Sequence, residues 1–206
     1  MIELVNTSGI FALDGGEWEV TNNIWIVGDD REVIIIDAAH DAQPIVAAVH
    51  GRHVAAIALT HGHNDHINAA AALQDAVDAP ILLHPDDLML WHVVYPDRDP
   101  DGPLVDRSLL KGGGTELGVL HTPGHAPGCC CFHIVGAGDG GRDIVFSGDT
   151  LFCGGPGATG RSYSDYDTIV ESIRSRLFAL PDSTIVHTGH GESTTIGAEA
   201  EALGRR

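Results

Sequence analysis

Short, uninterrupted apolar runs mark the start of the chain. Residues 18–36 read as two strands joined by the turn GDD, and VIIID at residues 33–37 begins with four apolar side chains in a row. Such a run is typical of a strand that is buried on both faces. A helical pattern follows at residues 42–51, and VAAIALT at residues 54–60 predicts a second buried strand that leads into a histidine-rich turn.

The middle of the chain alternates helical patterns with shorter apolar runs. The Ala and Leu content of residues 64–77 predicts a helix, residues 80–83 a short strand, and residues 85–96 a second helix with proline in its first turn. Residues 97–114 combine Asp, Pro and Gly, which favours a loop that covers part of a site.

The last part of the chain predicts further strands and one strongly amphipathic helix. Ile169, Ile173 and Leu177 recur at helical spacing within residues 164–180, and a proline follows this stretch. The predicted strands cover residues 115–125, 128–136, 142–150 and 183–192.

Units of strand, turn and helix recur in both halves, while several strands follow one another without a helix between them. This order favours an α/β (α+β) fold, an αββα sandwich of two mixed sheets with helices on the outer faces, over a doubly wound parallel sheet. A chain of 206 residues is long enough for one well-filled core. We therefore expect a single domain over residues 1–206.

Metal-binding side chains gather where the predicted strands end. His and Asp are the only types among them, and imidazole and carboxylate together suit zinc, iron or manganese. The first turn can supply two neighbouring ions because its ligands lie on both sides of a bend, and a carboxylate further along can bridge them. The residues are His61, His63, Asp65, His66, His125, Asp149 and His190.

The composition of the chain argues against several classes of binding partner. Asp and Glu number 29 against 11 Lys and Arg, giving a formal net charge of −18, which opposes binding to nucleic acid or anionic lipid. The sequence shows neither a basic, apolar leader nor a membrane-spanning run, so we expect a cytoplasmic protein. Adjacent Cys129, Cys130 and Cys131 alternate sides of a predicted strand and favour buried thiols over a disulfide framework. Cys153 is expected to pack in the core or to line its loop.

The motifs resemble those of the metallo-β-lactamase-fold hydrolases, and most closely those of the glyoxalase II (hydroxyacylglutathione hydrolase) group. The matching stretches span residues 33–197 and are VIIID, THGHNDH, HTPGHAPG, FSGDTLF and HTGHGESTTIG. The resemblance implies the metallo-β-lactamase fold and a pair of divalent metal ions, zinc first and iron or manganese as alternatives. It implies His61, His63 and His125 at the first ion, Asp65, His66 and His190 at the second, Asp149 as the bridge and Asp37 behind the ligands.

The chain departs from glyoxalase II at two points. We expect the C-terminal helical domain that grips glutathione in that group to be missing, because the sequence ends 16 residues after His190. Ala158 stands where the group usually has a lysine that holds the thiol carrier. The side chains left to shape a substrate pocket are His84, Trp91, His92, Tyr95, Arg161 and Tyr163, with Arg161 either meeting a carboxylate or hydroxyl-rich group or anchoring its loop through a salt bridge.

These features favour a small-molecule S-acyl thioester as substrate, such as an S-formyl or S-2-hydroxyacyl thiol. A thiolate leaves without prior protonation, and Asp65 is the one evident general acid besides activated water. The Ala- and Gly-rich composition resembles that of high-GC bacteria, some of which use mycothiol, so mycothiol is one candidate carrier. The alternatives are a single-iron persulfide dioxygenase, in which Asp65 and His66 are idle, and a lactonase or β-lactamase-like hydrolase. A homo-oligomer is compatible with the sequence, which does not decide the oligomeric state.

Overall fold

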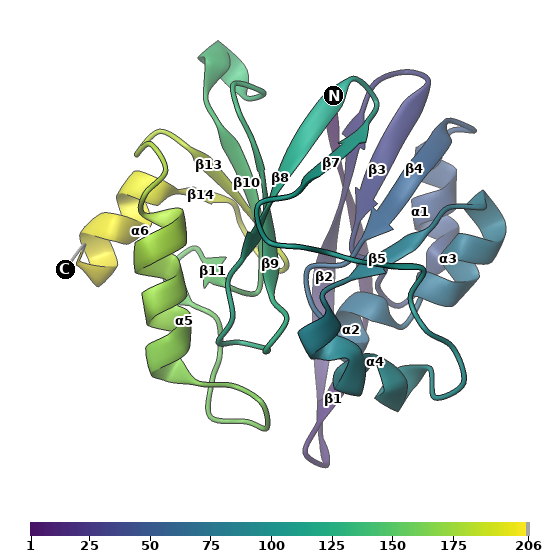
Figure 1. Cartoon of the computed structure of the whole chain (residues 1–206), viewed down its shortest axis with the longest axis horizontal. Helices are drawn as coiled ribbons and strands as arrows, with labels where there is room; N and C mark the ends of the chain where they lie inside the picture. The colour runs from purple at the N-terminus through teal and green to yellow at the C-terminus, as the bar shows by residue number, and fades with distance from the viewer. Residues whose placement is uncertain (205–206) are drawn as a thin grey trace.

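The apolar runs of the chain form the central strands of two β-sheets that face each other. The structure is a computed structural model that describes residues 1–204 (Figure 1). The first sheet has the order β1 (Ile2–Leu13), β2 (Gly16–Gly28), β3 (Glu32–Ile36), β4 (His53–Ala58), β5 (Ile81–Leu83) and β6 (Gly102–Pro103). The second has the order β14 (Thr194–Thr195), β13 (Ile185–Thr188), β10 (Ile144–Gly148), β9 (Cys130–Ile134), β8 (Thr115–His121) and β7 (Leu109–Gly112). A separate small hairpin joins β11 (Leu151–Phe152) to β12 (Gly155–Pro156).

Helices cover the outer face of each sheet, as Figure 1 shows. The first sheet carries α1 (Ala42–Val49), α2 (Asn64–Ile67), α3 (Ala70–Val77), the 3₁₀ turn η1 (Pro85–Asp87) and α4 (Leu88–Val94). The second carries α5 (Tyr166–Ser172), its π-helical continuation η3 (Ile173–Leu177) and α6 (Ile196–Leu203), and a 3₁₀ turn η2 (Asp139–Gly141) lies between β9 and β10. The predicted αββα sandwich of mixed sheets is confirmed.

The uninterrupted apolar runs are explained by burial on both faces of a sheet. On β3, Ile35 packs with the helical layer around Ile45, whereas its neighbour Ile34 packs between the sheets with Phe132. Successive strand residues point to opposite faces, so both faces need apolar side chains where helices cover one and a second sheet covers the other. The predicted apolar stripe of the 164–180 helix is also buried, against the second sheet.

The N-terminal strand β1 was not predicted. It pairs antiparallel with β2 along its whole length, from Ile2 opposite Val27 to Leu13 opposite Gly16. The turn between them is Asp14–Gly15, and both residues have positive φ, 53° and 77°. A two-residue turn of this kind matches the twist of a hairpin, and the dipeptide Asp-Gly is its usual sequence signal.

Three other segments differ from their prediction. The expected helix over residues 64–77 is divided into α2 and α3, because Ala38 donates to the His66 carbonyl and accepts from the Ala69 amide, both at 2.9 Å, in place of helical partners. Residues 97–114 contain the edge strands β6 and β7. Residues 196–203 form α6, in which the Thr195 hydroxyl caps the Ala198 amide.

The adjacent cysteines are free and buried, as expected, while Cys153 is exposed. Cys130 packs between the sheets and Cys131 packs under the second helical layer. Burial raises the pKa of Cys130 and Cys131, so both are thiols rather than thiolates. Within residues 1–204, no helix has the length and apolar content needed to cross a bilayer.

Candidate metal centre

Four strands end at one edge of the sandwich and bring together all seven predicted ligands. β4 leads to the first histidines, the first turn of α2 carries the next pair, and β8, β10 and β13 supply one residue each. In this order the residues are His61 and His63, Asp65 and His66, then His125, Asp149 and His190.

The first ligand group consists of three buried histidines. The Nδ1 atom of His63 lies 3.1 Å from His61 Nε2 and 3.0 Å from His125 Nε2. Ligands about 2.0–2.1 Å from a tetrahedral zinc ion lie about 3.3 Å from one another, so the three nitrogens are spaced as ligands of one ion.

The second ligand group combines two histidines with a carboxylate. His66 Nε2 and His190 Nε2 are 3.2 Å apart, and Asp65 Oδ2 lies 3.6 Å from the first and 3.3 Å from the second. Asn22 donates to the same carboxylate oxygen over 3.1 Å. This spacing again fits the ligands of a single ion.

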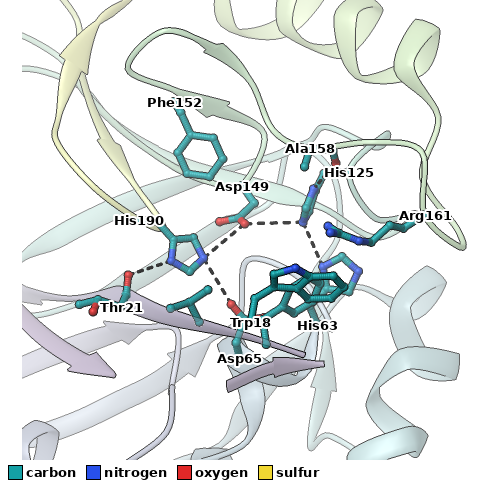
Figure 2. A pocket seen from close by; sticks show the side chains of 12 residues that line it. Trp18, Thr21, His63, Asp65, His125, Asp149, Phe152, Ala158, Arg161 and His190 are labelled. Atoms are coloured by element: carbon teal, nitrogen blue, oxygen red, sulfur yellow. Dashed lines mark hydrogen bonds and ion pairs between the residues drawn. The ribbon is translucent and has the colours of Figure 1, made fainter. Parts of the chain in front are cut away.

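Asp149 stands between the two groups (Figure 2). Its Oδ1 lies 3.3 Å from His66 Nε2, and its Oδ2 lies 3.6 Å from His125 Nε2 and 3.4 Å from His190 Nε2. Oδ1 is buried and accepts no hydrogen bond from the described residues. A buried carboxylate oxygen that accepts no hydrogen bond and lies beside a histidine nitrogen can serve as a bridging metal ligand, so the donor set fits two divalent ions.

Burial and neighbouring charges shift the histidine pKa values of the two ligand groups in different directions. Burial lowers the pKa of His63 to about 3, and it also holds the pKa of His61 and His125 below the ordinary value, so these rings are neutral and keep a lone pair for a metal. Burial alone would lower the pKa of His190, but the Asp149 carboxylate raises it to about 10. The carboxylates of the second group thus favour a positive charge beside its histidines, which a bound cation would supply.

Hydrogen bonds behind the ligands fix the orientation of the rings. Asp37 accepts from His66 Nδ1 at 2.9 Å and from the Thr60 amide at 2.7 Å, which aims His66 Nε2 at the centre. The Nδ1 atoms of His125 and His190 each lie 2.8 Å from a backbone carbonyl, that of Ala158 and that of Thr21. Partners of this kind set the tautomer and raise the basicity of metal-binding histidines. Asp37 thus lies where the resemblance implies.

Asp87 also supports the ligand loops and was not predicted from the sequence. This fully buried carboxylate accepts from the amide of Gly62, between the first two histidines, over 2.8 Å. It also accepts from the amide of Gly128, just beyond His125, over 2.6 Å. Burial raises the pKa of Asp87 to about 6. The sequence PDD signals only a helix start, so no local pattern pointed to this role.

Asp87→Asn is expected to weaken metal binding about tenfold while the protein still folds. The amide of Asn accepts from one backbone N–H, but its NH₂ group faces the other, so one ligand loop loses its support. A competition titration against a chromophoric chelator measures the effect. The matched control is Asp86→Asn, because the side chain of Asp86 is 60% exposed. Equal affinity in both variants would contradict the assignment.

An open cavity of about 450 Å³ lies over the ligands (Figure 2). Its apolar wall comes from the tip of the β1–β2 hairpin, from β11 and from the loop after β12. Phe11 and Trp18 of this wall were not predicted, because residues 2–13 were not recognised as a strand. The lining residues are Phe11, Trp18, Val20, Thr21, His63, Asp65, His125, Asp149, Phe152, Ala158, Arg161 and His190.

Three of the predicted pocket residues lie in α4 or directly after it, within the first helical layer, so their assignment to a pocket is corrected. Trp91 is fully buried in the core beneath the first sheet. The Tyr95 hydroxyl donates to the Ile67 carbonyl over 2.9 Å, and His92 pairs with Asp99 at 2.8 Å. These contacts hold α4 against its neighbours and leave none of the three side chains facing the cavity.

Of the other three predicted pocket residues, one lines the cavity and two do not. His84 stacks on His121, with ring centroids 4.0 Å apart, and Tyr163 is 57% exposed at positive φ; neither lines the cavity. Arg161 does line it. The segment around residues 84–115 therefore contributes support through Asp87 and no cavity wall.

Comparison with known proteins agrees with this geometry. Residues 18–190 match the sequence model of the metallo-beta-lactamase superfamily. The hydroxyacylglutathione hydrolase GloC of Haemophilus influenzae is 34% identical over 191 residues, covering 85% of this chain and 87% of that protein.

Two solved structures share the fold. The B3 metallo-beta-lactamase BLEG-1 superposes with a TM-score of 0.77 at 28% identity, covering 95% of this chain and 97% of that one. TTHA1623 in a di-iron-bound form gives 0.74 at 34% identity, covering 89% and 94%. The family predicted from the motifs is thus confirmed, and the chain belongs to the metallo-beta-lactamase superfamily.

Proposed function

We propose that the protein is a binuclear metal-dependent hydrolase that cleaves small S-acyl thioesters. The observation that carries the proposal is the pair of three-ligand groups that share Asp149 at the floor of an open cavity. The likeness to GloC, which is named a hydroxyacylglutathione hydrolase, supports a thioester. The likeness to TTHA1623, which has a di-iron-bound form, supports two ions.

The chemistry is divided between the ions and the chain. Two bound divalent ions, zinc in our proposal, would activate water and polarise the substrate carbonyl. Asp65 lines the cavity and is fixed by Asn22 and His190, so we assign it the role of holding and passing on a proton. A thiolate leaving group has a solution pKa of about 8.5 and leaves without a strong acid beside it.

The cavity wall supports a thiol carrier other than glutathione. Ala158, in the place of the usual lysine of the glyoxalase II group, is exposed and lines the cavity with a methyl group. Mycothiol is one carrier to test beside glutathione. The comparison needs S-acyl forms of both carriers with the same acyl group.

The decisive measurement is metal content, by elemental mass spectrometry, together with thiol release. We expect about two ions per chain in the wild type and about one in Asp65→Ala, because the variant lacks a ligand of the second group. Thiol release from a thioester panel should fall in parallel. Asp30→Ala, at an exposed aspartate between β2 and β3, is the matched control and should keep both ions.

The rival activities give different results in the same experiment. One iron per chain, unchanged by Asp65→Ala, with oxygen consumed on a persulfide, would replace the proposal by a dioxygenase. Two ions with turnover of lactones or β-lactams but no thioester would keep the binuclear centre and change the substrate.

A further inference from the structure

Arg161 lies at the mouth of the cavity, and no carboxylate of the described residues pairs with it. Its guanidinium carbon lies 4.0 Å from the centre of the Trp18 ring and 5.6 Å from that of Phe11. Among residues 1–204 it has no carboxylate within ion-pair distance, whereas Arg52 pairs with Glu3 and Arg176 with Asp106. The loop-anchoring salt bridge is therefore not what holds this side chain.

The loop that carries Arg161 is fixed at two points beside the metal centre. The carbonyl of Ala158 lies 2.8 Å from His125 Nδ1, and the amide of Ser162 donates to Asp14 Oδ2 over 2.9 Å. The same contact occupies the Asp14 carboxylate and lowers its pKa, with a smaller contribution from the field of Arg161. The guanidinium thus lies on an aromatic surface, and its side-chain N–H groups donate no hydrogen bond within residues 1–204. Figure 2 shows the side chain at the edge of the cavity.

We propose that Arg161 binds a carboxylate of the substrate, so that the preferred substrates are thioesters with a carboxylate in either the acyl group or the thiol carrier. This inference rests on the proposed thioesterase function. A guanidinium presents paired N–H donors in a plane that matches the two oxygens of a carboxylate. Stacking on Trp18 preorganises that plane, because it limits the orientations of the side chain.

The charge of the chain favours a carboxylate over a phosphate. With a formal net charge of −18, the protein repels anions in general, and Arg161 is the one Lys or Arg among the described residues that line the cavity. One guanidinium balances one carboxylate, whereas a doubly charged phosphate would keep one uncompensated charge at the mouth of the cavity. The wall formed by Phe11, Trp18 and Phe152 fits the apolar part of such a substrate.

The test compares carboxylate substrates with their neutral carboxamide isosteres. In the carrier arm, the same acetyl group is placed on 3-mercaptopropionate and on 3-mercaptopropionamide. In the acyl arm, glutaryl and glutaramoyl groups are placed on 2-mercaptoethanol. Arg161→Gln should raise KM about tenfold or more for the carboxylate in one arm, leave kcat little changed, and leave the isostere within about twofold. Arg161→Lys, which keeps the charge without the planar fork, should lie between.

Arg142→Gln is the matched control, at an arginine remote from the cavity whose Nε donates to the Asp139 carbonyl. Equal effects of Arg161→Gln on carboxylate and carboxamide, or no effect on either, would overturn the inference. If the wild type releases no thiol from any thioester, the proposed function fails instead. In that case calorimetry measures the binding of the carboxylate products of both arms and of their carboxamides, without turnover. Tighter binding of a carboxylate that Arg161→Gln abolishes supports the role of Arg161. The absence of such a preference in the wild type overturns the role.

Discussion

Asp149→Ala is expected to lower kcat/KM about 10³-fold or more, a loss of about 4 kcal/mol in transition-state stabilisation, and to remove metal from both groups. The reason is position: this one carboxylate lies within 3.6 Å of His66, His125 and His190, which belong to different ligand groups. No other carboxylate among residues 1–204 makes contacts of this kind with both groups.

The measurements are kcat/KM on the best thioester, ion count, and circular dichroism of the variant. A folded but inactive protein is the expected outcome, because the sheets and their apolar layers do not depend on Asp149. Asp167→Ala, at an exposed aspartate in the first turn of α5, controls for the loss of a negative charge. Unfolding in step with metal loss would instead indicate that the ions only brace the fold.

The residues of the two ligand groups could be picked out from the sequence because each motif is local. His61 and His63 follow one strand directly, and Asp149 follows another, so spacing along the chain already placed them at strand ends. Strand β3 was equally predictable from its apolar run, because a strand buried on both faces has no polar position. What local patterns indicate well is the residue type that a buried strand or a metal requires.

The substrate wall was not predictable in the same way. Asp14 and Ser162, whose contact joins the hairpin to the cavity loop, are 148 residues apart in the sequence. Asp87 joins Gly62, 25 residues before it, to Gly128, 41 residues after it. Such contacts depend on the packing of whole layers. The four aromatic and histidine residues expected in the pocket from the 84–115 segment show the same limit, because their chemistry suited a pocket. Trp91 is instead buried in the core, Tyr95 and His92 bond to other parts of the first helical layer, and His84 stacks on His121.

Gly189→Ala is expected to lower kcat/KM by about 10²-fold or more, because misplacement of a ligand by about 1 Å has an effect of this size. A Cβ atom at residue 189 would overlap Asp149 Oδ1 and lie 2.9 Å from His66 Cε1. The backbone itself accepts alanine, since φ of Gly189 is not among the positive values. The added methyl group is therefore expected to displace the bridging carboxylate of Asp149 and the ring of His66, a ligand of the second ion.

The backbone around Gly189 cannot move aside to relieve this overlap. Its amide donates to the Gly148 carbonyl over 2.9 Å, and its carbonyl accepts from the Asn23 amide over 2.8 Å, so both sheets hold it. Ion count should drop towards one per chain while the thermal unfolding temperature of the metal-free protein changes little. Gly118→Ala is the matched control, because the nearest atom to its Cβ would be the His133 carbonyl oxygen at 3.6 Å. Two ions and full activity in Gly189→Ala would show that Asp149 has room to shift, and that the narrow space around it is not what holds the second ion.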